Sequence, residues 1–212
     1  MKKIIALLGV FLMGVTLAWA AGPVAGETPQ QTVQAASDVL LHELKAKKIQ
    51  IDKDPPKVLY SIVKESVLPY IDINGMVSDT LGREGNQQWI KAPAAEKTEF
   101  IDEMTKLIVG TYSGALTQYD DQAVKIYPVR GYKPDMTAAQ VNSELITKQG
   151  QAIGISYQMV KQGDVWKVRD FSVEGVSLVN SYQAQFQSII ADKNLEGLIQ
   201  TLKEHNAANQ PT

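Results

Sequence analysis

The chain has 212 residues, of which 44% are hydrophobic and 21% are charged, and its formal net charge is −2 at pH 7. This length and composition are typical of one folded domain with a sizeable core, and they exclude a disordered polyelectrolyte. The absence of cysteine excludes disulfides, thiolate nucleophiles, iron–sulfur clusters and acylation at a lipobox.

The first twenty residues have the pattern of a secretory signal peptide. Lys2 and Lys3 precede an apolar run over residues 4–17, and Ala18-Trp19-Ala20 is a small-x-small cleavage site. The alternative is an uncleaved anchor, but the apolar run is short for a bilayer and no stop-transfer charges follow it. We therefore expect cleavage after Ala20 and export, with a bacterial periplasm as the location.

Cleavage would remove two of the 21 basic residues, leaving 19 basic and 23 acidic residues and a formal charge of −4. An acidic protein is not attracted by its overall charge to nucleic acid or to anionic lipid headgroups. The sequence thus predicts no nucleic-acid partner, and it favours docking on proteins if the chain visits a membrane.

The first half of the mature chain has the periodicity of helices. Residues 21–30 contain Gly and Pro and are predicted to be a flexible linker. Asp54 is a candidate N-cap with Pro55 at the first helical position. The predicted helices and breaks are a helix over 32–47, a helix from Pro55 to Pro69, a short helix over 72–81, a break over 82–85 and a long helix over 94–119.

After Asp120 the apolar period changes to two, which indicates strands. Strands are predicted over 124–127, 141–148, 153–159 and from Trp166 onward, with a tight turn at Gln162-Gly163-Asp164. Glu174-Gly175 then leads into a helix with a stripe of Leu178, Tyr182, Phe186 and Ile189, and a last helix covers 195–204. The pattern predicts an α+β fold in which several helices pack on one face of a curved antiparallel sheet of four to five strands. We expect a single domain over 31–206 and a disordered tail over 207–212.

Few residues in the chain could carry catalysis. His42 and His205 are the only histidines and neither has a partner at ligand spacing, so no metal or cofactor site is predicted. Asp170 interrupts an apolar strand and Asp72 precedes a helix. For both we favour a structural role, such as a cap or a bond to a backbone N–H, over a role as general base.

Apolar side chains are abundant on two opposed layers. The long helix offers Phe100, Met104, Ile108 and Tyr112, and the strands offer Val124, Ile126, Ile153, Ile155, Tyr157, Val168 and Val173. The residues alone do not distinguish a closed core from an apolar pocket between these layers.

Several segments resemble the MlaC, or Ttg2-type toluene-tolerance, family of periplasmic phospholipid-binding proteins. Leu68-Pro69-Tyr70-Ile71-Asp72 resembles a Pro-Tyr-x-Asp segment, and Leu81-Gly82-Arg83 a Leu-Gly-Arg/Lys element. The helix from Phe100 to Tyr112 is similar to the family's Phe-x3-Phe-x2-Leu-Leu-x2-Thr-Tyr helix, with Met104 in place of the second Phe. The stretch from Trp166 to Phe186 resembles the closing segment, and residues 195–202 resemble the terminal helix.

The resemblance implies a carrier rather than an enzyme, with phospholipid as cargo, no cofactor and a monomeric state. It implies transfer of phospholipid between the outer-membrane lipoprotein MlaA with its porin and an inner-membrane ABC transporter with an MCE-domain subunit, which maintains outer-membrane asymmetry. The implied pocket lies between the helices and the sheet. The residues expected to line it are Met76, Leu81, Phe100, Met104, Ile108, Tyr112, Val124, Ile126, Ile153, Ile155, Tyr157, Val168 and Val173.

The chain departs from the family pattern at two places. Glu84-Gly85-Asn86-Gln87-Gln88 stands before Trp89 where the family has an aromatic pair, and Gln183 stands where an Arg is common. Two other functions stay open: an enzyme on a cone-shaped fold like the nuclear-transport-factor superfamily, with Asp170 or Asp72 as base, and a periplasmic adaptor without a pocket.

Overall fold

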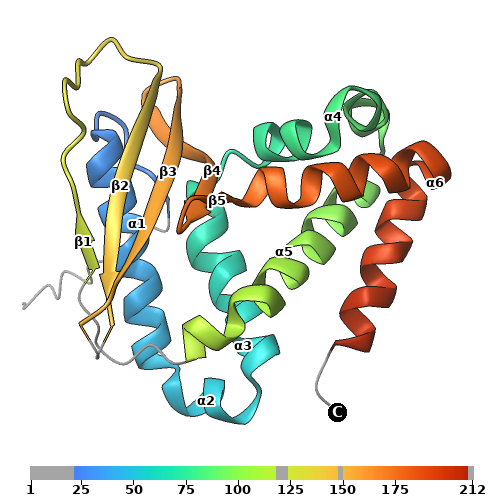
Figure 1. Cartoon of the computed structure of the whole chain (residues 1–212), viewed down its shortest axis with the longest axis horizontal. Coiled ribbons are helices and arrows are strands. Elements are labelled where there is room, and N and C mark those ends of the chain that lie inside the picture. Colours follow the sequence, from blue (N-terminus) through green and yellow to red (C-terminus); the bar gives the residue numbers. More distant parts are fainter. Residues whose placement is uncertain (1–21, 118–123, 148–149, 210–212) are drawn as a thin grey trace, which may run out of the picture.

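The computed structural model describes residues 22–117, 124–147 and 150–209. Five strands form one antiparallel sheet in the order β1-β2-β3-β4-β5, which is also their order along the chain. Helix α1 lies across this sheet, and α4, α5 and α6 pack together beside it (Figure 1). The α+β fold predicted from the sequence is confirmed. The strands are β1 (Val124–Ile126), β2 (Ala138–Ile146), β3 (Ala152–Gln162), β4 (Val165–Val173) and β5 (Val176–Ser177).

The first helix begins earlier than its apolar stripe suggests. Helix α1 (Pro29–Ala46) starts inside the range expected to be linker, because Thr28 and Gln31 form a capping box and Pro29 occupies the first turn. The preceding segment is joined to the sheet, since Gly26 N–H donates to the Asp164 carbonyl (3.0 Å). The predicted linker therefore ends at Thr28 among the described residues, and the expected signal peptide at 1–20 lies outside them.

Short helices follow α1 and lead the chain to β4. They are α2 (Lys48–Lys53), α3 (Pro55–Ile62), a π-helical turn (Val63–Val67) and a 3₁₀ turn (Leu68–Tyr70). Asp54 precedes α3 as predicted, but its side chain makes no capping hydrogen bond. Ile71 then pairs with Val168 in a parallel bridge, and Asp72 N–H donates to the Val168 carbonyl (2.8 Å). This contact fixes the start of α4 against the sheet.

Two long helices are bent rather than broken. Helix α4 (Ile73–Lys91) has non-helical dihedrals at Gly82 alone, so the break predicted over 82–85 is wrong beyond that residue. Helix α6 (Leu178–Ala208) bends at Asn194, which separates the two helices predicted there into two arms. It extends two residues past the expected end of the domain at 206. Helix α5 (Ala94–Thr117) runs between them, and no helix within the described ranges is long and apolar enough to span a bilayer.

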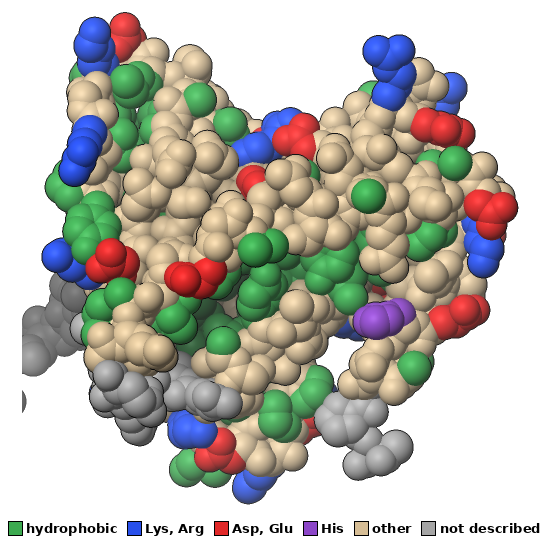
Figure 2. Space-filling model, viewed as in Figure 1, with side chains coloured by type: hydrophobic (Ala, Val, Ile, Leu, Met, Phe, Trp, Pro, Cys, Tyr) green, Lys and Arg blue, Asp and Glu red, His purple; other side chains and the backbone are tan. Residues whose placement is uncertain are grey.

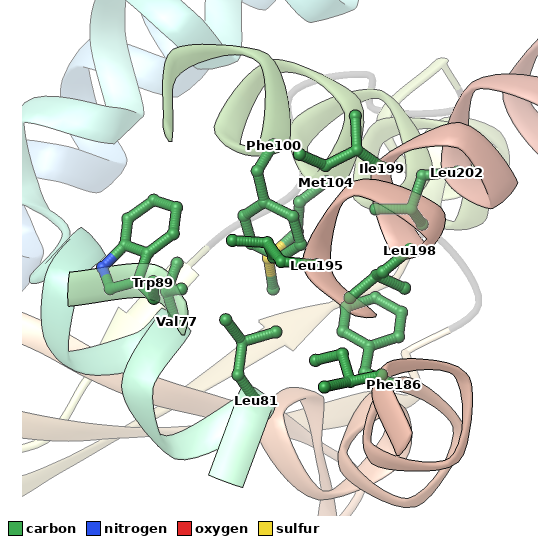
Figure 3. Close-up of a cluster of buried hydrophobic side chains, with 11 residues drawn as sticks. Val77, Leu81, Trp89, Phe100, Met104, Phe186, Leu195, Leu198, Ile199 and Leu202 are labelled. Atoms are coloured by element: carbon green, nitrogen blue, oxygen red, sulfur yellow. The ribbon is translucent and has the colours of Figure 1, made fainter. Parts of the chain in front are cut away.

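Among the described residues, the buried hydrophobic side chains other than Tyr70 form four clusters. A folded domain of this size usually has one contiguous core with small satellites. The helical cluster, shown in Figure 3, joins α4, α5 and α6 through Val77, Leu81, Trp89, Phe100, Met104, Phe186, Ile190, Leu195, Leu198, Ile199 and Leu202. The sheet cluster consists of Val33, Val141, Met159, Trp166 and Val168, the α1–α3 cluster of Leu44, Ile51, Leu59, Ile62 and Val109, and the junction cluster of Met76, Leu178 and Val179.

Candidate ligand-binding groove

The strand register places the apolar residues of four strands on one face of the sheet. Directly paired residues share a face. Reading across the strands, one row is Val124, Leu145 and Ile153, the next is Ile126, Ser143, Ile155 and Val173, and a third is Val141, Tyr157 and Phe171. The opposite face is polar, with exposed Gln140, Asn142 and Gln158. All seven strand residues predicted to line a pocket therefore lie on the apolar face, with Val168 in the row beyond Tyr157.

A β-bulge makes this common face possible. Val168 and Val173 are five residues apart, so regular alternation would place them on opposite faces. The register between β3 and β4 shifts at Gln158/Met159, where Met159 pairs with Val168 and Gln158 pairs with Asp170. Arg169 is thus the extra residue. The shift turns Phe171 and Val173 toward the face that already carries Trp166 and Val168.

The two ends of this face differ in how they are covered. At one end, Met159, Trp166 and Val168 are 5% exposed or less and pack against Val33 of α1. At the other end, a group of aliphatic side chains is partly exposed and packs against none of the four clusters of described residues. This group, the groove wall, consists of Val124, Leu145, Ile153, Ile155 and Val173. Apolar side chains left uncovered beside packed ones mark a surface that a ligand can complete.

Helices α5 and α6 provide the side that faces the groove wall. Ile108 and Tyr112 of α5 and Tyr182 of α6 are partly buried against the junction cluster. The Tyr112 ring lies 6.1 Å from the Phe171 ring, centre to centre, which joins α5 to β4. Figure 2 shows hydrophobic side chains lining a hollow between the sheet and these two helices, near the β4–β5 turn. We call this hollow the groove.

The hydroxyl groups of two tyrosines beside the groove, Tyr157 and Tyr182, lie next to other hydroxyl groups. The Ser143 hydroxyl donates to the Tyr157 hydroxyl (3.4 Å), and Thr111 Oγ1 lies 3.1 Å from the Tyr182 hydroxyl. Burial raises the pKa of Tyr157 and of Tyr112, so both phenols stay neutral at physiological pH. The groove therefore carries no charge of its own on these side chains and suits an apolar ligand.

The other predicted lining residues divide between two places. Met76, Ile108 and Tyr112 lie at the junction beside the groove. Leu81, Phe100 and Met104 are instead 4% exposed or less inside the helical cluster, where the Phe100 ring lies 5.6 Å from Trp89 and 6.2 Å from Phe186 (Figure 3). These three side chains serve the core of the helices and do not meet the residues of the sheet.

Two further hollows flank the first arm of α6. A cavity of about 250 Å³ lies between α5 and both arms of α6, and its lining includes Leu107, Tyr182, Phe186 and His205. A polar cleft of about 630 Å³ lies on the opposite side of the arm, between α4, α6 and the bulge, and includes Arg83, Asp79, Arg169 and Gln183. Within the described part of the chain, no group of three or more His, Cys, Asp or Glu is placed to hold a metal ion.

Arg169 uses its bulged position to bind two carboxylates. Its Nε and Nη2 donate to Asp79 (2.6 and 2.9 Å), and its Nη1 donates to Asp72 (2.8 Å). Burial on its own would raise the pKa of Asp72, but hydrogen bonds from Arg169 and from Gly75 N–H outweigh it and hold that pKa below its ordinary value. The hydrogen bonds to Asp79 and Asp72 raise the pKa of Arg169. We call Asp72, Asp79 and Arg169 the Arg169 cluster.

The carboxylates of both candidate catalytic acids, Asp72 and Asp170, are hydrogen-bonded to groups that hold the fold together. Asp72 caps α4 by accepting from Gly75 N–H (3.1 Å) in addition to binding Arg169. Asp170 accepts from the Ser177 hydroxyl (2.5 Å) and from Val179 N–H (3.1 Å), so it holds the start of α6. The structural role favoured for both acids agrees with these contacts. A carboxylate with its oxygens occupied in this way is poorly placed to accept a substrate proton.

A family model described as MlaC protein matches residues 34–204. The chain belongs to the MlaC protein family. This membership confirms the resemblance found in the sequence.

Relatives in the MlaC family cover most of the chain at modest identity. The toluene tolerance protein ttg2D of Pseudomonas putida is 25% identical over 180 residues, which are 82% of this chain and 81% of the relative. The intermembrane phospholipid transport system binding protein MlaC of Haemophilus influenzae is 27% identical over 192 residues, covering 89% and 86%. A solved phospholipid-binding protein of Ralstonia solanacearum, in complex with a phospholipid, has a TM-score of 0.76 and 26% identity over 87% of this chain and 100% of its own.

Several residues beside the groove were not predicted from the sequence. Phe171 was not among the predicted lining residues, although Val173, which has the same parity, was. The bulge places both on the apolar face beside Trp166 and Val168. Tyr182 belongs to the helical stripe predicted from the sequence but was not among the predicted lining residues. Leu145 could have been found, since residues 141, 143 and 145 share one face of the predicted strand over 141–148 and Val141 is apolar.

Proposed function

We propose that this chain is a periplasmic phospholipid carrier whose groove holds the acyl tails. The observation that carries the proposal is the groove wall, an aliphatic surface on the sheet opposite α5 and α6 whose side chains are partly exposed and join no buried cluster of the described residues. The fold that surrounds it matches, over the full length of that protein, a structure in complex with a phospholipid. The residues proposed to contact the tails are Ile108, Tyr112, Val124, Ile126, Ile153, Ile155, Tyr157, Phe171, Val173 and Tyr182.

The energetics of tail transfer fit an apolar groove without catalytic groups. A diacyl lipid with about thirty methylenes gains on the order of 25 kcal/mol when its tails leave water, at about 0.8 kcal/mol per methylene. A bilayer gives nearly the same gain. A carrier that both takes up and releases lipid therefore needs an affinity for the tails that is close to that of the bilayer and not much higher. Partly exposed Ile, Val and Leu side chains supply such a surface, and the flexible thioether of Met76 at the junction accommodates tails of different length.

We place the carrier in a route between two membranes. The signal peptide expected at residues 1–20 would export the chain, with cleavage after Ala20, and the monomer would take phospholipid between MlaA with its porin and the MCE-domain subunit of an inner-membrane ABC transporter. Such transfer would maintain outer-membrane asymmetry. The name of the Haemophilus influenzae relative, which speaks of intermembrane phospholipid transport, supports this route.

Lipid loading is the direct test of the proposal. The exported protein is purified gently, and native mass spectrometry together with solvent extraction measures the bound phospholipid. We expect a mass increment equal to one or more phospholipids. A lipid-free mass in repeated preparations, with no phospholipid in the extract, would overturn the proposal and favour the adaptor without a pocket.

The variant Asp170→Asn distinguishes the carrier proposal from the alternative of an enzyme that uses Asp170 as general base. The amide oxygen can still accept from Val179 N–H, so the variant removes the charge while keeping an acceptor at the start of α6. A carrier with this substitution loads as much lipid as the wild type. Bound lipid that the wild type converts to a new product, and that the variant leaves intact, would support the enzyme instead.

A further inference from the structure

The sheet and the helices are joined very differently at the two edges of the groove. At the β4 edge, the Arg169 cluster, the Ile71–Val168 bridge and the Asp72 N–H bond to Val168 tie α4 to β4. At the α5 edge, helix and sheet meet through the ring pair of Tyr112 and Phe171, whose centres are 6.1 Å apart. A bidentate arginine–carboxylate pair is directional and strong, whereas two rings can slide or separate at small cost.

The Arg169 cluster is a built feature rather than an incidental surface pair. The bulge directs Arg169 away from the apolar face, and Asp72 is 5% exposed. Gly75 leaves the room that the guanidinium occupies, because a Cβ at this position would lie 1.9 Å from Arg169 Nη1 and 2.1 Å from Asp72 Oδ2. The next residue, Asp170, holds the start of α6. One bulge therefore fixes both α4 and α6 to β4.

We propose that Arg169 and Asp79 are positioning residues for lipid exchange, which hold the β4 edge of the groove closed so that the groove opens at its α5 edge. The inference rests on the proposed lipid-binding function. Neither residue lies on the groove wall, so they act through the distance between the sheet and the helices and not by touching the tails. Weakening the cluster then speeds lipid entry and exit together and leaves the amount of lipid bound at equilibrium nearly unchanged.

Asp79→Asn is the variant that tests this role. The Asp79 side chain is 45% exposed, so the substitution is compatible with folding, and Asp72 still holds Arg169. Exchange is measured with vesicles of phosphatidylethanolamine and phosphatidylglycerol that carry a self-quenched fluorescent phospholipid, and occupancy is measured by native mass spectrometry. We expect exchange to be about 3-fold to 10-fold faster at equal occupancy, as suits the loss of a bidentate, partly exposed pair.

The chain offers a matched control and a conservative rescue. Glu99 is also 45% exposed and pairs with Lys203, but this pair joins α5 to the second arm of α6, away from the sheet. Glu99→Gln is expected to leave the exchange rate unchanged, and Asp79→Glu is expected to restore much of the wild-type rate. Added salt screens an exposed ion pair, so it should accelerate exchange in the wild type more than in Asp79→Asn.

Spin labels locate the edge that opens. The chain has no cysteine, so labels attach only where Cys is introduced. Ala115→Cys with Val176→Cys spans the α5 edge, and Asn74→Cys with Lys167→Cys spans the β4 edge. We expect the distance across the α5 edge to change between lipid-free and lipid-loaded protein, with the distance across the β4 edge constant.

Each result either supports or overturns the inference. Unchanged exchange in Asp79→Asn, an equal acceleration in Glu99→Gln, or widening at the β4 edge would overturn it while lipid loading itself remained intact. Loss of lipid from Asp79→Asn alone would also overturn it, because Asp79 would then be part of the binding site. If the wild-type protein binds no lipid, the proposed function is overturned, and this inference falls with it.

Discussion

The helical cluster and the groove wall have similar side chains and opposite packing. Leu81, Phe100 and Leu198 of the helical cluster are 1% exposed or less, whereas Ile153, Ile155 and Val173 of the groove wall are partly exposed and join no cluster. Hydrophobic residues at both places follow the periodicity of their helix or strand. The difference shows that periodicity determines which face of an element is apolar, and that the partner across from it determines whether the face becomes core or binding surface.

The largest effect is expected inside the helical cluster. Phe100 is 0% exposed and contacts the rings of Trp89 and Phe186. Phe100→Ala should lower the free energy of unfolding by about 3–5 kcal/mol, because it removes apolar contact and leaves a cavity. Urea unfolding measures this loss. Lipid bound per folded molecule should stay at the wild-type level, and a specific loss of lipid would show that Phe100 reaches the groove after all.

The groove wall is expected to respond in the opposite way. Ile155→Asp places a charge where tails would lie, so lipid loading should fall at least about tenfold, while the cost in stability stays near or below about 1–2 kcal/mol because Ile155 is partly exposed. Native mass spectrometry and urea unfolding measure the two quantities.

The same substitution at another site serves as the control for Ile155→Asp. Ile49 of α2 is 71% exposed, so Ile49→Asp should change neither loading nor stability by much. If Ile155→Asp unfolds the protein, the groove wall is part of a closed core and the distinction between the two regions fails.

The helices and strands were predicted from the sequence better than the way in which they pack against one another. The apolar stripe of α5 was read correctly, but α5 is 24 residues long and extends past the sheet. Its first half packs under α4 and α6, so Phe100 and Met104 contact helices, and its second half brings Ile108 and Tyr112 to the groove. Spacing along one helix carries no information about where along its length the partner changes.

The β-bulge at Arg169 could not be predicted from the sequence. A bulge changes the parity of every residue that follows it, and Arg169 has no sequence signal that marks it as the extra residue. The prediction that Val168 and Val173 both line the pocket therefore disagreed with strict alternation, yet the structure places both on the apolar face. Asp72, by contrast, directly precedes a helix, where capping is a local interaction that the sequence can predict. The bond from Val179 N–H to Asp170 joins a strand to the start of α6 and depends on the fold.

Gly75→Ala tests the close contact that joins the two regions. The added Cβ would lie about 2 Å from both Arg169 and Asp72 and would force the ion pair apart. We expect a loss of about 1–3 kcal/mol in the free energy of unfolding. Gly110→Ala on α5 is the control, because a Cβ there meets nothing within 4 Å and should raise stability by about 0.5–1 kcal/mol through helix propensity. Equal effects at the two glycines would show that Gly75 serves helix flexibility and not the ion pair.

A smaller effect is expected from the charge of Asp72. The pKa of Asp72 is lower in the folded protein than its ordinary value, so the carboxylate stabilises the fold above an ordinary pKa of about 4 and loses that contribution as the pH falls through the lower folded pKa. Asp72→Asn keeps the acceptor for Gly75 N–H but weakens the bond from Arg169. It should lower the free energy of unfolding by about 1–2 kcal/mol at neutral pH and by less at about pH 3.

Asp102 is the control for Asp72, because it is another carboxylate with a lowered pKa but is more exposed. Its pKa is also lowered, since hydrogen bonds from Lys64 and Tyr60 outweigh the opposing effect of burial, but its side chain is 29% exposed against 6% for Asp72. Solvent screens the Asp102 pair, so Asp102→Asn should cost about 0.5 kcal/mol or less at neutral pH. Urea unfolding of both variants at the two pH values measures the difference. If Asp72→Asn is as mild as Asp102→Asn, the Arg169 cluster holds the sheet and the helices together no more firmly than an ordinary surface pair, and the groove has no fixed edge.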